Sequence, residues 1–166
     1  MTTAQPLLVT GACGFSGSHL VKHLLAEGQE VVATDLESSF LSTARRRVLS
    51  LIGLDMRHPR LEVVPADLAE DVDVERLFDR ELSTVFHTAS LYDYSASPAE
   101  LHRLNVEAFG TLIGRAARAD LERFVHWSTC GVFGHPYKLS HRRANAPFTE
   151  DSPSPRSSPD GAAGPA

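Results

Sequence analysis

The sequence predicts an α/β fold in which a parallel sheet of about five strands is covered by helices on both faces. The first observation is that short apolar runs and amphipathic stretches alternate between residues 6 and 127. Connections of this kind join parallel strands by right-handed crossovers. The second observation is that a glycine, an acid or a small residue follows the end of each apolar run. Ligands bind at the carboxyl ends of the strands in such sheets, so the pattern predicts a binding site along one sheet edge.

The first strand–helix junction carries the most specific pattern. Residues 6–9 are an apolar run typical of a buried strand, residues 17–26 are an amphipathic helix, and Gly11, Gly14 and Gly17 mark the connection. One glycine permits a tight turn, a second lets the backbone approach a pyrophosphate, and a third lets the helix pack closely on the strand. The start of the helix adds unpaired N–H groups and the positive end of its dipole. This junction predicts a dinucleotide-binding loop.

The second predicted strand ends in an acid where such a loop requires one. Residues 30–35 form a β-prone run that ends at Asp35, and a carboxylate about 20 residues past the loop binds the adenosine ribose hydroxyls. A helix is expected over residues 38–54, and its three arginines at 45–47 have two interpretations, a solvated helix face or a clamp for the 2′-phosphate of NADP. A carboxylate at the ribose repels that phosphate. Asp35 therefore predicts NAD over NADP.

The third predicted strand, residues 61–64, is followed by Asp67 and Leu68. Two interpretations of Asp67 remain open on spacing alone. Its side chain can cap the next helix, which begins near Asp73. It can equally receive the adenine amino group, because it lies at the same sheet edge as Asp35.

The remaining segments complete the alternation. Residues 84–90 predict a fourth strand that is covered on both faces, and residues 91–97 predict a loop. A long helix is expected from residue 98, a proline suited to the first turn, to about residue 119, and residues 121–127 predict a fifth strand. Asn105 interrupts the apolar face of the long helix and needs a hydrogen-bond partner if it is buried.

The composition indicates one soluble cytoplasmic domain. The chain has 166 residues and a formal net charge of −5, which argues against a nucleic-acid surface, since that requires a basic face. No apolar run approaches membrane-spanning length, and the N-terminus lacks a signal pattern. Cys13 and Cys130 form no metal or redox spacing and suit a reducing compartment. His126, His135 and His141 share no ligand spacing, so no metal site is predicted.

With these motifs in this order, the chain resembles the extended short-chain dehydrogenase/reductases, the NAD-dependent epimerase/dehydratase group. The resemblance covers about residues 7–151 and rests on the glycine loop, Asp35, Asp67–Leu68, residues 85–89, Asn105–Val106 with Gly110–Thr111, and Ser128–Thr129 with residues 132–134. It implies a Rossmann-type doubly wound sheet with NAD as cofactor.

The resemblance also implies roles for single residues. Asp67 and Leu68 would hold the adenine, the backbone of Ala89 would lie along the dinucleotide, and Asn105 would be a structural asparagine. Cys13 lies between the loop glycines, where its small side chain fits. The complete set of predicted cofactor-binding residues is Gly11, Cys13, Gly14, Phe15, Gly17, Asp35, Asp67, Leu68, Thr88, Ala89, Ser90, Asn105 and Ser128.

The catalytic residues that the resemblance implies are only partly present. Thr129 corresponds to the family's catalytic Ser/Thr, which hydrogen-bonds the substrate oxygen. The family's acid/base is a Tyr whose phenol pKa is lowered by a Lys four residues later. The chain contains no such pair, and at that spacing Tyr137 is followed by His141. The implied reaction is hydride transfer between nicotinamide and the carbinol carbon of a small molecule, such as a nucleotide sugar or a sterol-like alcohol.

The last residues change character. From Ser152 onward the sequence is rich in Ser, Pro, Gly and Ala and cannot bury enough apolar surface to order itself. We expect an incomplete NAD(P)-binding domain over residues 1–151 and a disordered tail over residues 152–166, with the later strands and the substrate lobe missing. Such a chain is expected to be an inactive epimerase/dehydratase or dehydrogenase domain. A non-catalytic dinucleotide-sensing module is the alternative, and a homodimer through the long helices, common in the resembling group, stays open.

Overall fold

The computed structural model describes residues 5–93 and 95–129 of the chain. The chain divides into two compact units, Met1–Trp127 and Ser128–Ala166. The strands and helices described below all belong to the first unit. The predicted boundary at residue 151 and the predicted tail lie outside the described residues.

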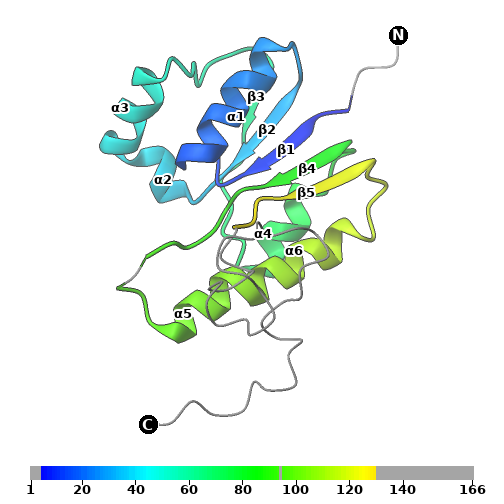
Figure 1. Cartoon of the computed structure of the whole chain (residues 1–166). Coiled ribbons are helices and arrows are strands. Elements are labelled where there is room, and N and C mark those ends of the chain that lie inside the picture. The colour runs from blue at the N-terminus through cyan, green and yellow to red at the C-terminus, as the bar shows by residue number, and fades with distance from the viewer. Residues whose placement is uncertain (1–4, 94, 130–166) are drawn as a thin grey trace, which may run out of the picture. The chain divides into compact units, whose positions relative to one another are not determined.

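The first unit is built on a sheet of five parallel strands in the order β3–β2–β1–β4–β5 (Figure 1). β1 pairs with both β2 and β4, so the chain moves outward from β1 to β3 and then starts again on the other side at β4. The carboxyl ends of β1 and β4 therefore flank the topological switch point, where doubly wound sheets bind their ligands. The strands are β1 (Leu7–Thr10), β2 (Val31–Thr34), β3 (Leu61–Val63), β4 (Thr84–His87) and β5 (Arg123–His126).

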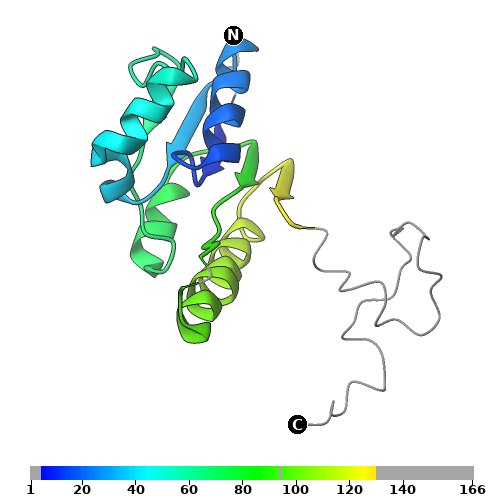
Figure 2. The same cartoon turned by 60° about the vertical axis from the view of Figure 1, so that its left-hand side comes forward.

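Helices cover both faces of this sheet, as the sequence predicted. Figures 1 and 2 show α1, α2 and α3 on one side of the sheet and α4, α5 and α6 on the other. The helices are α1 (Phe15–Ala26), α2 (Glu37–Leu41), α3 (Thr43–Leu51), α4 (Asp71–Leu77), α5 (Pro98–His102), a π-helical turn η1 (Arg103–Glu107) and α6 (Ala108–Ala116).

The period of the strands explains why the sheet has two cores. Successive strand residues point to opposite faces, so Leu8 of β1 belongs to the cluster under α4 and α6, and Val9 belongs to the cluster under α1 and α3. Leu112 of α6 and Leu49 of α3 are almost fully buried in these two clusters. Burial of this kind stabilises the fold by roughly 2–5 kcal/mol for each leucine, judged by truncation to alanine.

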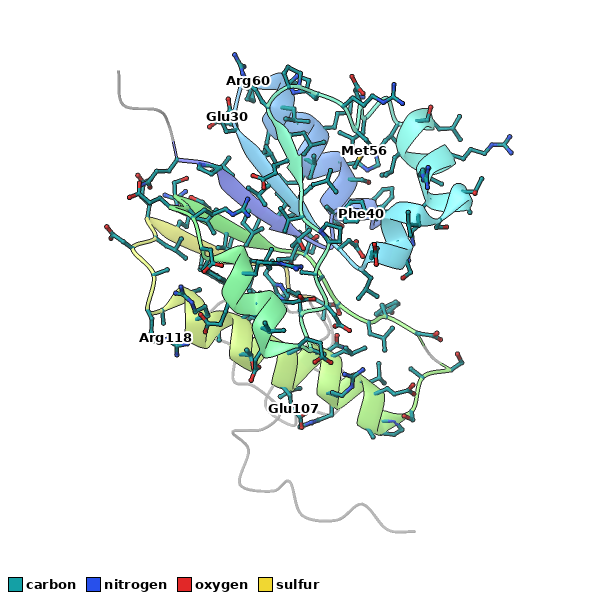
Figure 3. All side chains as sticks on the ribbon, turned by 180° about the vertical axis from the view of Figure 1, so that it is seen from behind. Glu30, Phe40, Met56, Arg60, Glu107 and Arg118 are labelled. Atoms are coloured by element: carbon teal, nitrogen blue, oxygen red, sulfur yellow. The ribbon has the colours of Figure 1, made fainter. Side chains whose placement is uncertain are left out.

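The segment between β2 and β3 packs onto the α1 face. Phe40 and Met56 lie against the cluster under α1 and α3 (Figure 3). At the start of β2, Glu30 and Arg60 form an ion pair of 3.7 Å between two half-exposed side chains (Figure 3). An exposed pair of this kind contributes little to stability, so apolar packing holds this segment in place.

The single helix predicted over residues 38–54 is wrong. Ser42 adopts an extended conformation with φ −63° and ψ 119°, and it separates α2 from α3. Its side chain accepts a hydrogen bond of 3.4 Å from the backbone N–H of Arg45 and so caps α3. Of the apolar residues of α3, Val48 and Leu51 are exposed while Leu49 is buried.

The long helix predicted from residue 98 to about residue 119 is correct in its start and is modified in its middle. Ser97 is its N-cap residue and forms a capping box with Glu100, and Pro98 lies between them in the first turn. The helix then passes through η1 and ends at Ala116. The predicted strands over residues 84–90 and 121–127 shorten to β4 and β5 at four residues each.

Candidate functional site

The glycine loop between β1 and α1 is held in a conformation that requires glycine at two positions. Gly11 has a φ of +67°, and a Cβ there would lie 2.8 Å from backbone atoms of Ala89. At Gly17 a Cβ would lie 2.2 Å from the carbonyl oxygen of Gly11. Gly14 is less restricted, with 3.1 Å to that oxygen, and its N–H donates to the same oxygen at 2.9 Å. The loop is therefore packed tightly against both α1 and the end of β4.

The start of α1 faces this loop without a side-chain cap. Gly14 is the N-cap residue and makes no side-chain hydrogen bond, and the first turn contains no acid. The N–H groups of Phe15, Ser16 and Gly17 have no acceptor within the helix, because the ladder begins with the N–H of Ser18 bonded to Gly14. These donors and the helix dipole favour an anion here.

Asp35, directly after β2, is bound to the same loop. Its Oδ2 accepts a hydrogen bond of 2.9 Å from the N–H of Cys13, and its Oδ1 accepts one of 2.9 Å from the N–H of Leu36. Each carboxylate oxygen keeps a second lone pair, so Asp35 can accept further hydrogen bonds from ligand hydroxyls. The structure places the predicted ribose-binding acid beside the predicted diphosphate loop.

Cys13 is buried behind this loop. Burial, and after it the Asp35 carboxylate, raises the pKa of the Cys13 thiol to about 12. The thiol is therefore protonated at neutral pH, which makes it a poor nucleophile. This agrees with its interpretation as a small residue that fills space between the glycines.

Asp67 does not cap α4. The N-cap residue of α4 is Glu70, which makes no side-chain cap bond. The Oδ1 of Asp67 accepts a hydrogen bond of 2.9 Å from the N–H of Ala69, and the N–H of Asp67 donates to Oδ2 of Asp73 at 2.8 Å. The structure thus excludes Asp67 as the cap of α4. Asp67 lies at the carboxyl edge of the sheet.

Side-chain hydrogen bonds join the ends of β1 and β4. The hydroxyl of Thr88 donates to the carbonyl of Thr10 at 2.7 Å, and the N–H of Ala89 donates to Oγ1 of Thr10 at 3.3 Å. The same Oγ1 lies 2.8 Å from Nδ1 of His87. Burial, and then the neighbouring His126, lowers the pKa of His87 to about 4, so this network contains a neutral imidazole at physiological pH.

Asn105 fixes the loop that follows β4. Its Oδ1 accepts hydrogen bonds from the N–H of Leu91 at 2.8 Å and from the hydroxyl of Ser90 at 3.2 Å. Its Nδ2 donates to the carbonyl of Leu91 at 2.9 Å. The partner that this polar residue required is therefore the loop backbone, and the π-helical turn η1 presents Asn105 to it.

These features meet in a cleft of about 340 Å³. Of the predicted cofactor-binding residues, the cleft is lined by Gly11, Gly14, Asp35, Asp67, Leu68, Thr88, Ala89 and Ser90. A larger hollow of about 710 Å³ lies beside β3 and α4 and shares Leu36, Ala66 and Asp67 with the cleft, but the glycine loop does not line it. The glycine loop and Asp35 line the smaller cleft, which makes it the candidate site.

The other predicted residues do not line the cleft. Cys13 is buried, Gly17 packs on Gly11, and Asn105 acts through the loop it holds. Phe15 is 82% exposed and packs its ring against His19 at 4.7 Å between centroids. Ser128 and the predicted catalytic Thr129 belong to the second unit, whereas Cys130, His135, Tyr137 and His141 lie outside the described residues.

Part of the cleft wall is formed by residues that the sequence motifs do not predict. Leu36, Ser39, Arg45, Arg103 and Leu104 also line it. The arginine run at 45–47 was a signal for one of them, but its residues cannot be told apart by spacing. Arg103 and Leu104 belong to η1, and no pattern in the sequence predicts this π-helical turn.

The described residues contain neither a membrane-spanning helix nor a cluster of metal ligands. Within residues 5–93 and 95–129, no helix is long and apolar enough to cross a membrane. Over the same residues, no cluster of three or more His, Cys, Asp or Glu side chains is placed to hold a metal ion.

Comparison with known proteins adds three kinds of finding. Residues 7–159 match the model of the NAD dependent epimerase/dehydratase family. The chain is 30% identical over 148 residues to UDP-glucose 4-epimerase of Haemophilus influenzae, covering 87% of this chain and 40% of the relative. It is 30% identical over 151 residues to 3 beta-hydroxysteroid dehydrogenase/Delta 5-->4-isomerase of Mycobacterium tuberculosis, covering 87% of this chain and 37% of the relative.

Among solved structures, the chain is similar to the Bordetella bronchiseptica enzyme WbmG in complex with NAD and UDP. The two share 27% identity with a TM-score of 0.72, over 92% of this chain and 44% of WbmG. The chain thus spans less than half the length of each of these proteins.

Proposed function

The chain belongs to the NAD-dependent epimerase/dehydratase family, and from that premise we propose that its first unit binds NAD in the 340 Å³ cleft. The observation that carries the proposal is the glycine cradle, which we define as the loop of Gly11, Gly14 and Gly17 at the start of α1. A Cβ at Gly11 or Gly17 would collide with backbone atoms, so glycine at these positions lets α1 begin directly against the loop, where the N–H groups of its first turn have no acceptor within the helix. A cradle of backbone amides at a helix N-terminus fits a diphosphate.

The neighbouring residues fit the remainder of the dinucleotide. Asp35 would accept hydrogen bonds from the hydroxyls of the adenosine ribose, while Asp67 and Leu68 would hold the adenine. Ala89 would lie along the dinucleotide, since it lines the same cleft as Gly11 and Gly14. NAD is favoured over NADP because the charge of Asp35 repels a 2′-phosphate.

We propose that the family reaction of this chain is hydride transfer at a carbinol carbon. Bound NAD supplies a nicotinamide ring that accepts or returns the hydride. Thr129 would hydrogen-bond the substrate oxygen. The 166 residues contain no Tyr-x-x-x-Lys pair, so the chain lacks a proton-transfer group that is worth roughly 10²–10⁴-fold in rate. We therefore propose that the chain by itself binds the dinucleotide and is nearly inactive in catalysis.

The proposed substrate of the corresponding whole enzyme is a nucleotide sugar. UDP-glucose 4-epimerase and the UDP complex of WbmG support this class. A sterol-like alcohol is the second candidate, and the relationship to the Mycobacterium tuberculosis steroid dehydrogenase supports it. The two are separated by titrating the NAD-loaded whole enzyme with UDP and with a hydroxysteroid.

The binding proposal is tested by calorimetric titration of the chain with NAD and with NADP. We expect one saturable site with tighter binding of NAD, and an Asp35→Asn variant should lose that preference. Asp120→Asn serves as the matched control, because Asp120 is exposed and does not line the cleft. A chain that unfolds cooperatively on heating yet binds neither dinucleotide would overturn the proposal.

A further inference from the structure

Arg45 of α3 reaches back to the glycine loop. Its Nη1 donates a hydrogen bond of 3.3 Å to the carbonyl oxygen of Cys13. The backbone N–H of Cys13 donates a hydrogen bond of 2.9 Å to Oδ2 of Asp35. The backbone of Cys13 is thus held by an anion on one side and by a cation on the other, both of which line the 340 Å³ cleft.

Within residues 5–93 and 95–129, most of the hydrogen-bonding capacity of the Arg45 side chain is unused. A guanidinium has five N–H donors, and the Cys13 carbonyl takes one of them. Among the residues that the structure describes, no carboxylate lies within ion-pair distance of Arg45. No ion pair within this described part of the chain therefore neutralises its charge.

The two neighbouring arginines behave differently. Arg46 donates to the carbonyls of Phe40 and Leu41 and so closes the end of α2. Arg47 is exposed and does not line the cleft. The solvated-face interpretation of the arginine run therefore applies to Arg47, whereas Arg45 carries a positive charge into the cleft beside the glycine cradle.

We propose that Arg45 binds a phosphate group of the dinucleotide's diphosphate, using the N–H donors that the Cys13 carbonyl leaves free. This inference rests on the proposed binding of NAD. Two reasons favour the diphosphate over a 2′-phosphate. The guanidinium is anchored to the loop that cradles the diphosphate, and Asp35 at the ribose repels a further phosphate there.

The test compares Arg45→Gln with wild type and with Arg47→Gln, its matched control on the same helix. Affinities are measured for NADH and NADPH by their fluorescence, and for NADP, ADP and adenosine by displacement of NADH. We expect Arg45→Gln to weaken NADH and ADP binding about tenfold, near the lower end for a hydrogen bond to a charged group, because the side chain is exposed. Adenosine should bind equally to all three proteins.

Three additional measurements separate a loss of binding from a loss of the fold. Arg45→Lys keeps the charge without the planar fork and should recover part of the lost affinity. The affinity of Arg45→Gln for ADP should also fall less steeply with added salt than that of wild type. Thermal unfolding identifies any variant that has lost the fold, and the Arg45→Lys result then decides the question.

Three outcomes would overturn the inference. The first is wild-type affinity of Arg45→Gln for NADH and ADP. The second is a loss that extends equally to adenosine, which would mean that Arg45 only shapes the loop. The third is a loss confined to NADP, which would assign Arg45 to a 2′-phosphate. In each of these cases the wild-type chain still binds NADH, whereas a wild-type chain that binds no dinucleotide overturns the proposed function as well.

Discussion

Replacing Gly17 by alanine perturbs the cradle by the smallest change available. The added methyl carbon would lie 2.2 Å from the Gly11 oxygen and 2.9 Å from the hydroxyl oxygen of Thr88. That hydroxyl is engaged with the carbonyl of Thr10 at 2.7 Å, so it cannot easily rotate away. Raising the first distance even to 3.0 Å requires a movement of about 0.8 Å by the loop or by the start of α1.

The size of the effect follows from that movement. Overpacking costs about 1–3 kcal/mol, offset by up to about 1 kcal/mol because alanine is the better helix former. We expect the free energy of unfolding to fall by roughly 1–2 kcal/mol. A shift of about 0.8 Å takes a hydrogen bond near 2.9 Å beyond its useful range, so NAD affinity should fall at least about tenfold.

Gly114→Ala is the matched control for this variant. Gly114 lies in α6, and a Cβ there meets nothing within 4 Å. The control should gain about 0.4–1 kcal/mol in stability and bind NAD as wild type does. Urea unfolding gives the stabilities, and calorimetric titration gives the affinities. Wild-type NAD affinity in Gly17→Ala would refute the reasoning that the loop is a close-packed diphosphate cradle.

Further predictions concern Asp35, Asn105 and His87. Asp35→Ala should bring the dissociation constants of NAD and NADP closer together in calorimetry, and an unchanged ratio would exclude the ribose role. Asn105→Ala leaves the N–H and carbonyl of Leu91 without their partner and should cost about 1–3 kcal/mol in urea unfolding, unlike Glu107→Ala on the exposed side of η1. The pKa of His87 is lowered to about 4 in the fold from about 6.5 in an unfolded chain. The neutral imidazole therefore makes its full contribution to the free energy of unfolding above pH 6.5. That contribution, about 3 kcal/mol, should be lost as the pH falls from 6.5 towards 4, because the unfolded state binds the proton first. A His87→Phe variant should show a flatter dependence of unfolding free energy on pH over that range, and a dependence equal to wild type would contradict the assignment.

The parts of the fold that depend on local pattern were predictable. Alternating apolar runs and amphipathic stretches gave the five parallel strands and the helices on both faces. The glycine spacing and Asp35 gave the position of the cleft, because only glycine accepts the φ of +67° at Gly11 and the close approach at Gly17.

The remainder depends on tertiary structure. Ser42 is compatible with a helix interior and with an N-cap, and the fold uses it as a cap. This break restarts α3 and sets the direction from which Arg45 reaches Cys13, so its role could not be read from three consecutive arginines. The π-helical turn that presents Asn105 and Arg103 is a change in backbone hydrogen bonding that no side chain specifies.

The most direct test of the central claim is amide chemical-shift mapping of the ¹⁵N-labelled chain during titration with NAD. We predict that the largest changes fall on the amides of Phe15, Ser16 and Gly17, on Leu36 beside the Asp35 carboxylate, and on Ala89. Changes concentrated instead around Glu62 and Arg80, which line the larger hollow, would contradict it.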